Sequence, residues 1–243
     1  MPYADRFEAG GRLAARLRSL GTVPVGAEAV VLGLPRGGVP VAAAVARDLG
    51  APLDVVLVRK LGVPTQPELA MGAIGEGGVR ILDPGVLASA GVTGDELARV
   101  ELRERDELER RARRYRGDRQ PLPVAARTVV VVDDGIATGS TARAACQAVR
   151  ARGAARVVLA VPVAPRSWTD RLGAAADDLV AVETPEPFFA IGQFYDDFAQ
   201  VSDDQVVASL RRADWPGEAP VARPGGADGP GGSDRPPGAP PSP

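Results

Sequence analysis

The stretch VVVVDDGIATGST, from Val129 to Thr141, decides the fold of this chain. Its four consecutive valines predict a strand that is buried on both faces, as in a parallel sheet. Asp133 and Asp134 stand where that strand would end, and a loop of small and hydroxyl residues follows them. The alanine-rich segment 142–152 then predicts a helix that is closed by a glycine. The stretch therefore predicts a strand–loop–helix unit with two carboxylates at the end of the strand.

The loop within this unit has the composition of a phosphate site. Glycine and hydroxyl residues at a helix N-terminus direct backbone N–H groups and side-chain hydroxyls toward one spot, which suits a phosphate. The adjacent carboxylates suit vicinal hydroxyls, a hydrated divalent cation, or both. A sugar phosphate combines these features. The loop is not a Walker A motif, because it lacks the Gly-Lys-[Ser/Thr] ending. The alternative is a plain turn in which Thr138 and Ser140 only cap the next helix.

The order of residues in this stretch resembles a known binding loop. Four apolar residues, two acidic ones and a closing Ser/Thr-Gly-x-Ser/Thr resemble the loop that binds phosphoribosyl diphosphate (PRPP) in type I phosphoribosyltransferases. The resemblance covers about residues 28–200. It implies an α/β fold, an open parallel sheet with helices on both faces. A small hood at about 184–200 and a helical insertion at about 61–120 would complete a domain at 1–215. The Pro/Gly-rich tail, 216–243, is expected to be disordered.

The resemblance also implies roles for individual residues. Asp133 and Asp134 would hold the ribose 2′- and 3′-hydroxyls and steady the ribose cation that develops as diphosphate leaves. The 5′-phosphate would be bound by Ala137, Thr138, Gly139, Ser140 and Thr141. The leaving diphosphate would be bound by Arg36, Gly37, Gly38 and Lys60. Mg²⁺ would bridge the diphosphate and the ribose hydroxyls, with Asp133, Asp134 and Asp196 as the metal residues.

A second glycine loop lies upstream. Residues 28–34 predict a short strand, Pro35-Arg36-Gly37-Gly38 follows, and residues 40–49 predict a helix. A strand, a glycine turn with one cation and a helix start form another anion-binding geometry, although an ordinary βα turn has the same look. In relatives a non-proline cis peptide occurs in this loop, and the bond from Pro35 to Arg36 is its expected position here.

The next segment is predicted to combine a strand with a covering loop. Residues 54–58 predict a buried strand whose carboxyl end carries Arg59 and Lys60, and these would face the diphosphate unless they are simply solvated. Residues 61–83 are rich in Gly and Pro and are expected to form a mobile loop over the site. Glu68 and Glu76 would either orient the acceptor or belong to the surface.

The remaining elements follow from periodicity. The charged helix at 93–116 has a Thr93–Glu96 capping box, and Glu101–Arg105 and Glu109–Arg113 are favourable i,i+4 pairs. Its basic end is read as solvated, with substrate capture or a dimer contact left open. An amphipathic helix at 5–20 is expected against the sheet edge. Further strands are predicted at 156–163 and 179–183, and further helices at 167–175, capped by Ser167, and at 202–212.

An aromatic segment follows the last predicted strand. Five of the chain's ten aromatic residues lie between Pro185 and Phe198. This segment resembles the C-terminal hood of purine phosphoribosyltransferases, which implies that Phe189 stacks on the acceptor, with Ile191 beside it, and that Asp196 holds a metal-bound water. The alternative is that Phe188, Phe194 and Phe198 pack the hood onto the sheet.

Composition narrows the classes of function. The chain has one cysteine and no histidine, which excludes Cys/His metal sites and histidine-based acid–base catalysis. Cys146 is expected to be a buried thiol, and a single cysteine fits a cytoplasmic protein. A net charge of −2 suggests no nucleic-acid surface. No apolar run reaches the roughly 18 residues of a membrane span.

The resemblance implies transfer of a 5-phosphoribosyl group from PRPP to a nitrogenous base, with release of diphosphate, as in nucleotide salvage. Hypoxanthine-guanine enzymes have an aspartate where this chain has Ala137, which makes a 6-oxopurine acceptor less expected. A non-catalytic PRPP-binding regulator is the alternative. The sequence shows neither the added helix-turn-helix of a DNA-binding version nor the N-terminal cysteine of an amidotransferase, so neither version is expected. A homodimer is left open.

Overall fold

The computed structural model describes residues 2–213. Its centre is a five-stranded parallel sheet in the order β2-β1-β6-β7-β8. These strands are Leu53–Val55, Ala29–Gly33, Thr128–Val132, Arg156–Val163 and Asp178–Glu183. The predicted open parallel sheet is therefore confirmed, and β6 is its middle strand. The tail at 216–243, predicted to be disordered, lies outside the described residues.

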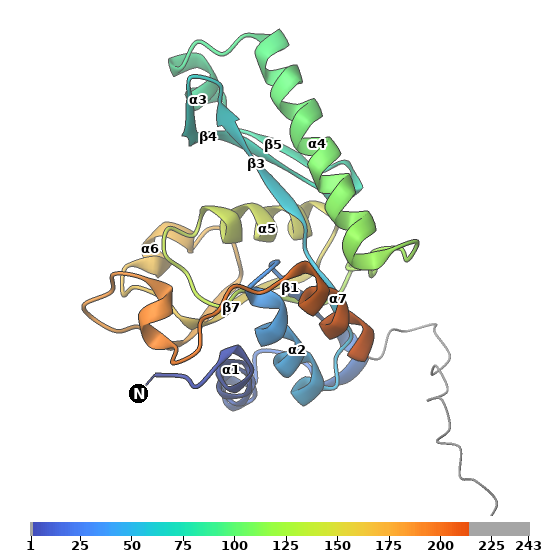
Figure 1. Ribbon diagram of the computed structural model, residues 1–243, viewed down its shortest axis with the longest axis vertical. Coiled ribbons are helices and arrows are strands. Elements are labelled where there is room, and N and C mark those ends of the chain that lie inside the picture. The colour runs from blue at the N-terminus through green and yellow to red at the C-terminus, as the bar shows by residue number, and fades with distance from the viewer. Residues whose placement is uncertain (1, 214–243) are drawn as a thin grey trace, which may run out of the picture.

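Helices cover both faces of this sheet (Figure 1). On one face lie α1 (Arg6–Leu20), α2 (Gly38–Leu49) and α7 (Asp203–Arg212), and on the other lie α5 (Ser140–Ala151) and α6 (Trp168–Leu172). The valines of β6 explain this layering, because Val130 and Val132 pack with the first group of helices and Val129 and Val131 with the second.

Two details of the helices differ from expectation. Helix α1 packs along α2 and over β7 and β8, so it lies on the face of the sheet and not only at its edge. Its apolar residues divide accordingly, with Leu13 and Leu17 buried and Phe7 and Leu20 exposed. Ser167 precedes α6, but its side chain makes no capping hydrogen bond.

The largest correction concerns residues 61–83. In place of a mobile loop, the chain forms an antiparallel sheet of β3 (Val58–Val63), β4 (Gln66–Gly75) and β5 (Arg80–Leu82). Its apolar residues form a small core of their own against α3 (Pro84–Ser89) and α4 (Gly94–Arg116). The many Gly and Pro residues weakened the alternation of polar and apolar residues that marks a strand.

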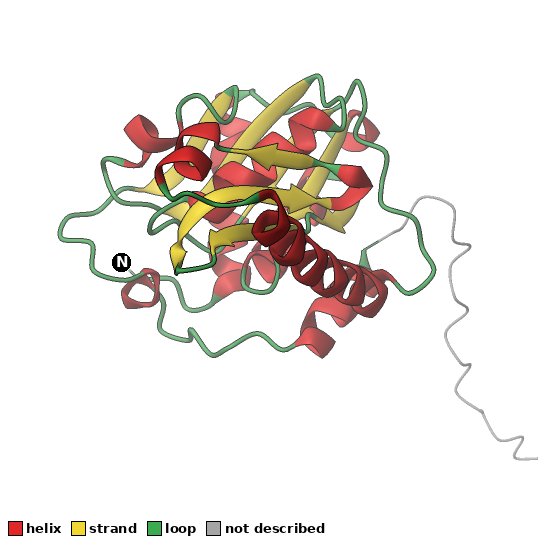
Figure 2. Cartoon of the chain, turned by 90° about the horizontal axis from the view of Figure 1, so that it is seen from above, coloured by secondary structure: helices red, strands yellow, loops and turns green. Residues whose placement is uncertain are grey.

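The insertion stands above α5 as a separate lobe (Figure 1), so that in a view from above its strands overlie the main sheet (Figure 2). Helix α5 packs against β3 and β4, which joins the lobe to the main sheet. The Thr93–Glu96 capping box and the Glu109–Arg113 pair are present as predicted. Glu101, however, pairs with Arg80 of β5 instead of with Arg105. This ion pair connects helix α4 to the antiparallel sheet of the insertion.

The N-terminal segment and the hood pack together at the carboxyl ends of β6 and β7. Tyr3 pairs with Tyr195 in an isolated parallel bridge, and its hydroxyl donates to the Pro162 carbonyl at 3.0 Å. A short 3-10 helix, η3 (Ile191–Phe194), lies in this hood, and two more, η1 (Gly26–Glu28) and η2 (Glu76–Gly78), lie elsewhere. Phe188, Phe194 and Phe198 pack onto this aromatic cluster, as the packing interpretation predicted.

Candidate functional site

Two loops meet at the carboxyl ends of β1 and β6, where a parallel sheet usually binds its ligands. The loop after β1 contains Gly37 and Gly38, and the loop after β6 begins with Asp133 and Asp134. A Cβ atom on Gly37 would lie 2.0 Å from Asp134 Oδ2, and one on Gly38 would lie 2.6 Å from the carbonyl oxygen of Val132. Only glycine allows the two loops to come this close.

The loop before α5 does not use its side-chain hydroxyls to cap the helix. Gly139 precedes the helix with φ of 81°, and a Cβ there would lie 2.8 Å from Leu172, so glycine is required on both counts. Within the described part of the chain, no side chain caps this helix, and the Thr138 and Ser140 hydroxyls form a 3.5 Å hydrogen bond with each other at an exposed position. The capping alternative for these residues is therefore wrong. The two hydroxyls instead lie exposed beside the start of the helix, which is the position at which helices commonly bind anions.

The two carboxylates have different surroundings. Asp133 accepts a hydrogen bond from the Asp134 N–H at 2.9 Å, and burial together with the neighbouring carboxylate raises its pKa well above the ordinary value. Burial also raises the pKa of Asp134, but the guanidinium of Arg6 opposes this shift. Arg6 Nε lies 2.8 Å from Asp134 Oδ2. A hydroxyl-rich or cationic ligand would relieve the desolvation of Asp133.

Arg6 and Tyr195 complete this group, and sequence reasoning missed both. The Tyr195 hydroxyl donates to the Asp134 carbonyl at 2.6 Å. Arg6 also donates to the Ala199 carbonyl at 2.9 Å, and its guanidinium carbon lies 3.9 Å from the centre of the Phe198 ring. These contacts span the chain from end to end, so no local sequence pattern marks them. The aromatic clustering of the hood was the only available signal.

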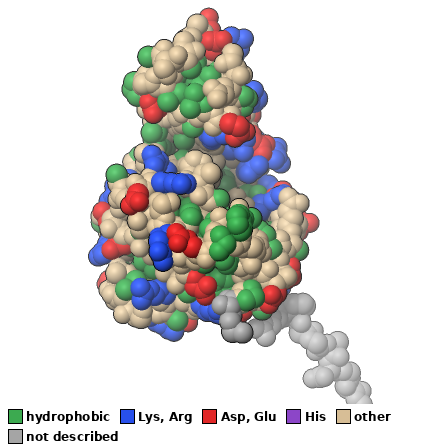
Figure 3. Space-filling view, turned by 90° about the vertical axis from the view of Figure 1, so that its left-hand side faces the viewer, with side chains coloured by type: hydrophobic (Ala, Val, Ile, Leu, Met, Phe, Trp, Pro, Cys, Tyr) green, Lys and Arg blue, Asp and Glu red, His purple; other side chains and the backbone are tan. Residues whose placement is uncertain are grey.

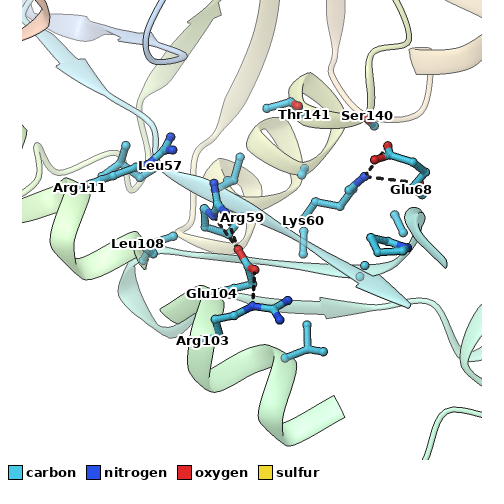
Figure 4. Close-up of a pocket in the computed structure, with 18 of the residues that line it drawn as sticks. Leu57, Arg59, Lys60, Glu68, Arg103, Glu104, Leu108, Arg111, Ser140 and Thr141 are labelled. Atoms are coloured by element: carbon cyan, nitrogen blue, oxygen red, sulfur yellow. Dashed lines mark hydrogen bonds and ion pairs between the residues drawn. The ribbon is translucent and has the colours of Figure 1, made fainter. Parts of the chain in front are cut away.

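A cavity of about 650 Å³ lies beside these loops, between the insertion and the main sheet. Its walls come from the end of β1, the strand β3, the helix α4 and the first turn of α5. Figure 4 shows Ser140 and Thr141 on one side of it and Lys60 and Arg59 on the other. Charged side chains also gather where the two lobes meet (Figure 3).

Most charges around the cavity are paired. Arg59 binds Glu104 of α4 through two hydrogen bonds of 2.9 and 2.6 Å, and Lys60 Nζ lies 3.3 Å from Glu68 Oε2. Arg59 and Lys60 belong to β3 of the insertion, so the prediction that they end a strand of the parallel sheet is wrong. Glu68 is an exposed partner of Lys60, in agreement with the surface interpretation.

The other predicted residues lie outside this cavity. Arg36 follows a cis peptide bond from Pro35, as expected, and its Nη1 lies 3.9 Å from Asp203 of α7. The side chain of Glu76 is 9% exposed and pairs with Arg116, which contradicts the surface interpretation of this residue. Cys146 is buried, which raises the pKa of its thiol to about 12.

The hood residues are separated from one another. Phe189 is 85% exposed, whereas Ile191 packs against Gly135. Asp196 is exposed, and its N–H donates to the Tyr3 carbonyl at 2.8 Å. Within residues 2–213, no three acidic, cysteine or histidine side chains form a cluster able to hold a metal ion. Asp196 is thus not grouped with Asp133 and Asp134. No helix in the described part combines the length and apolarity needed to cross a membrane.

Comparison with known proteins identifies relatives of this chain. Two curated proteins of Mycobacterium tuberculosis, from strains H37Rv and CDC 1551, are each 54% identical to it over 211 residues. Both are named, provisionally, as phosphoribosyl transferases. The match covers 87% of this chain and 47% of each relative, so the chain spans about half the length of these relatives.

A solved structure is also similar. The crystal structure of TT1426 from Thermus thermophilus has a TM-score of 0.78 and 48% sequence identity. The similarity covers 86% of this chain and 98% of that one. The family model for the phosphoribosyl transferase domain matches residues 5–198, which include both glycine loops and the insertion. The chain therefore belongs to the phosphoribosyl transferase family.

Proposed function

We propose that this protein transfers the 5-phosphoribosyl group of PRPP to a nitrogenous base and releases diphosphate. One observation carries the proposal: the uncapped hydroxyl loop before α5 lies beside two carboxylates that are in contact with the Gly37–Gly38 loop. This arrangement offers donors for a phosphate, acceptors for ribose hydroxyls and a second anion-binding turn, all within one family domain.

The roles of the residues follow the chemistry of such a ligand. Residues 137–141 bind the 5′-phosphate through hydroxyls and N–H groups. Asp133 accepts hydrogen bonds from the ribose and stabilises the positive charge that develops on it when the bond to diphosphate breaks. The loop at 36–38 receives the diphosphate, and Lys60 adds a positive charge from the cavity wall. Catalysis then rests mainly on position and electrostatics.

The donor set fits a magnesium ion. Asp133 and Asp134 are adjacent carboxylates, and oxygen ligands of this kind are those that Mg²⁺ prefers. When bound, the ion would neutralise charge on the diphosphate and so make the diphosphate a better leaving group. Asp133 is the better placed of the two to hold it, because Asp134 is already engaged by Arg6.

The test is titration calorimetry with PRPP, with and without Mg²⁺, on the wild type and on Asp133→Asn. Binding that requires Mg²⁺ and is lost in the variant supports the proposal. A screen of purine and pyrimidine bases for diphosphate release then identifies the acceptor. PRPP binding without release by any base would favour the non-catalytic regulator, and no PRPP binding by the wild type would contradict both functions.

A further inference from the structure

Arg6 is the one residue that connects the N-terminal helix to the carboxylate pair within residues 2–213. Its side chain is 11% exposed and that of Asp134 is 12% exposed, so their 2.8 Å contact is largely shielded from water. Phe198 covers the guanidinium at 3.9 Å, and the Ala199 carbonyl accepts from Nη1. A charged hydrogen bond in such surroundings is stronger and better ordered than one on the surface.

The Asp134 residue is fixed from three directions. Arg6 holds its Oδ2, the Tyr195 hydroxyl holds its backbone carbonyl, and Gly37 lies so close that a Cβ there would be 2.0 Å from Oδ2. Any shift of this carboxylate would therefore meet the Gly37 backbone or break the bond to Arg6. The position of Asp134 thus sets the position of the Gly37–Gly38 loop relative to Asp133.

From this geometry we propose that Arg6 is a positioning residue of the PRPP site and that it acts through Asp134. The two aspartates then divide their roles. Asp133 contacts the ligand, while Asp134 spaces the Gly37–Gly38 loop from the β6 loop. Arg6, Tyr195 and Phe198 make the N-terminal helix and the hood part of the binding site, although neither supplies the loops that contact PRPP. The inference rests on the proposed PRPP site.

A double-mutant cycle on PRPP affinity tests this inference. Calorimetry with PRPP and Mg²⁺ is carried out on the wild type, Arg6→Gln, Asp134→Asn and the double variant. Arg6→Gln should weaken binding by about tenfold, and the double variant should bind within about twofold of Asp134→Asn alone, because both changes remove the same contact. Arg6→Lys should recover most of the affinity, since it restores the charge.

The matched control is Arg18→Gln, which removes an ion pair with Asp48 from the same helix at 2.7 Å, away from the site. It should leave PRPP affinity within about twofold of wild type. Independent, additive losses from Arg6→Gln and Asp134→Asn would overturn the inference, as would an unchanged affinity in Arg6→Gln. If Arg6→Gln does not fold, the same cycle is measured with Arg6→Met, which also removes the charge but keeps an apolar side chain against Phe198. Absence of PRPP binding by the wild type would instead overturn the proposed function.

Discussion

At the scale of single residues, the charged form of Asp133 is unfavourable in the folded protein. Asp133 is only partly exposed and lies beside Asp134, and both desolvation and the neighbouring carboxylate raise its pKa, so the folded state binds this proton more tightly than the unfolded state does. Stability from this group is therefore present at low pH and falls as pH rises from about 4, the unfolded pKa, through the raised folded value. A ligand that compensates the charge would recover this loss.

The raised pKa predicts that removing the charge of Asp133 stabilises the fold but abolishes PRPP binding. Asp133→Asn should raise the Tm at pH 7 by about 2–4 °C, the shift expected for 1 kcal/mol in a chain of this size, while PRPP binding is lost. The gain should vanish near pH 4, where the wild-type carboxylate is itself protonated. Calorimetric melting at both pH values measures it. A variant that melts below the wild type at pH 7 would show that Asp133 is stabilising.

The close contact at Gly37 makes a second residue-level prediction. Gly37→Ala places a methyl group at the Asp134 carboxylate, which Arg6 prevents from moving aside, so the loop must shift. PRPP affinity should fall by at least about tenfold, or about 1.4 kcal/mol. Gly11→Ala is the control, because a Cβ at that position of α1 meets no atom within 4 Å. It should bind PRPP normally and gain up to about 1 kcal/mol in stability.

At the scale of elements, α4 is fastened to the main sheet by buried charges. Arg116 and Asp54 are 2% and 1% exposed in their side chains, and Nε lies 2.7 Å from Oδ1. Arg116 also binds Glu76 and donates to the Val55 carbonyl at 2.8 Å. A buried pair of this kind makes the junction specific, because removal of one partner leaves an unpaired charge in the interior.

Arg116→Ala should therefore lower the free energy of unfolding by about 3–5 kcal/mol. The control is Arg113→Ala one turn earlier, where the side chain is 71% exposed and its pair with Glu109 spans 3.7 Å. That change should stay within about 0.5 kcal/mol. Urea denaturation measures both. An equal, small effect of the two substitutions would mean that the Arg116 network does not hold the insertion to the sheet.

Features formed by residues that are adjacent in the chain could be predicted from the sequence, whereas contacts between distant residues could not. The four valines, the glycine loops and the Thr93 capping box are adjacent in the chain, and each was predicted within a few residues. Residues 61–83 were misread as a loop because Gly and Pro obscured the alternation of the strands that they form. Arg6 and Tyr195 escaped notice, since their contacts with Asp134 join residues separated by 128 and 61 positions.

At the scale of the whole molecule, the insertion forms one wall of the cavity beside the start of α5, whereas Asp133 and Asp134 lie outside the lining of that cavity. The cavity of about 650 Å³ takes its lining from both lobes, with Ser140 and Thr141 on the main domain and Lys60 and Arg111 on the insertion. Helix α5 contacts both the main sheet and the insertion strands. A ligand seated at the start of α5 would therefore contact elements that lie far apart in the chain.

Hydrogen exchange tests this shared wall. PRPP with Mg²⁺, or diphosphate with Mg²⁺, should slow exchange in β3 and in the α4 segment 100–111 as well as in the loop at 137–141, because a ligand that spans the cavity reduces the local opening of both lobes. The C-terminal turn of α1 at 16–20 serves as the unaffected control. Protection confined to residues 35–38 and 133–141 would mean that the insertion stands apart from the ligand. In that case Lys60→Ala should leave diphosphate affinity unchanged, whereas a shared wall predicts a loss of about tenfold for the removal of one charged contact.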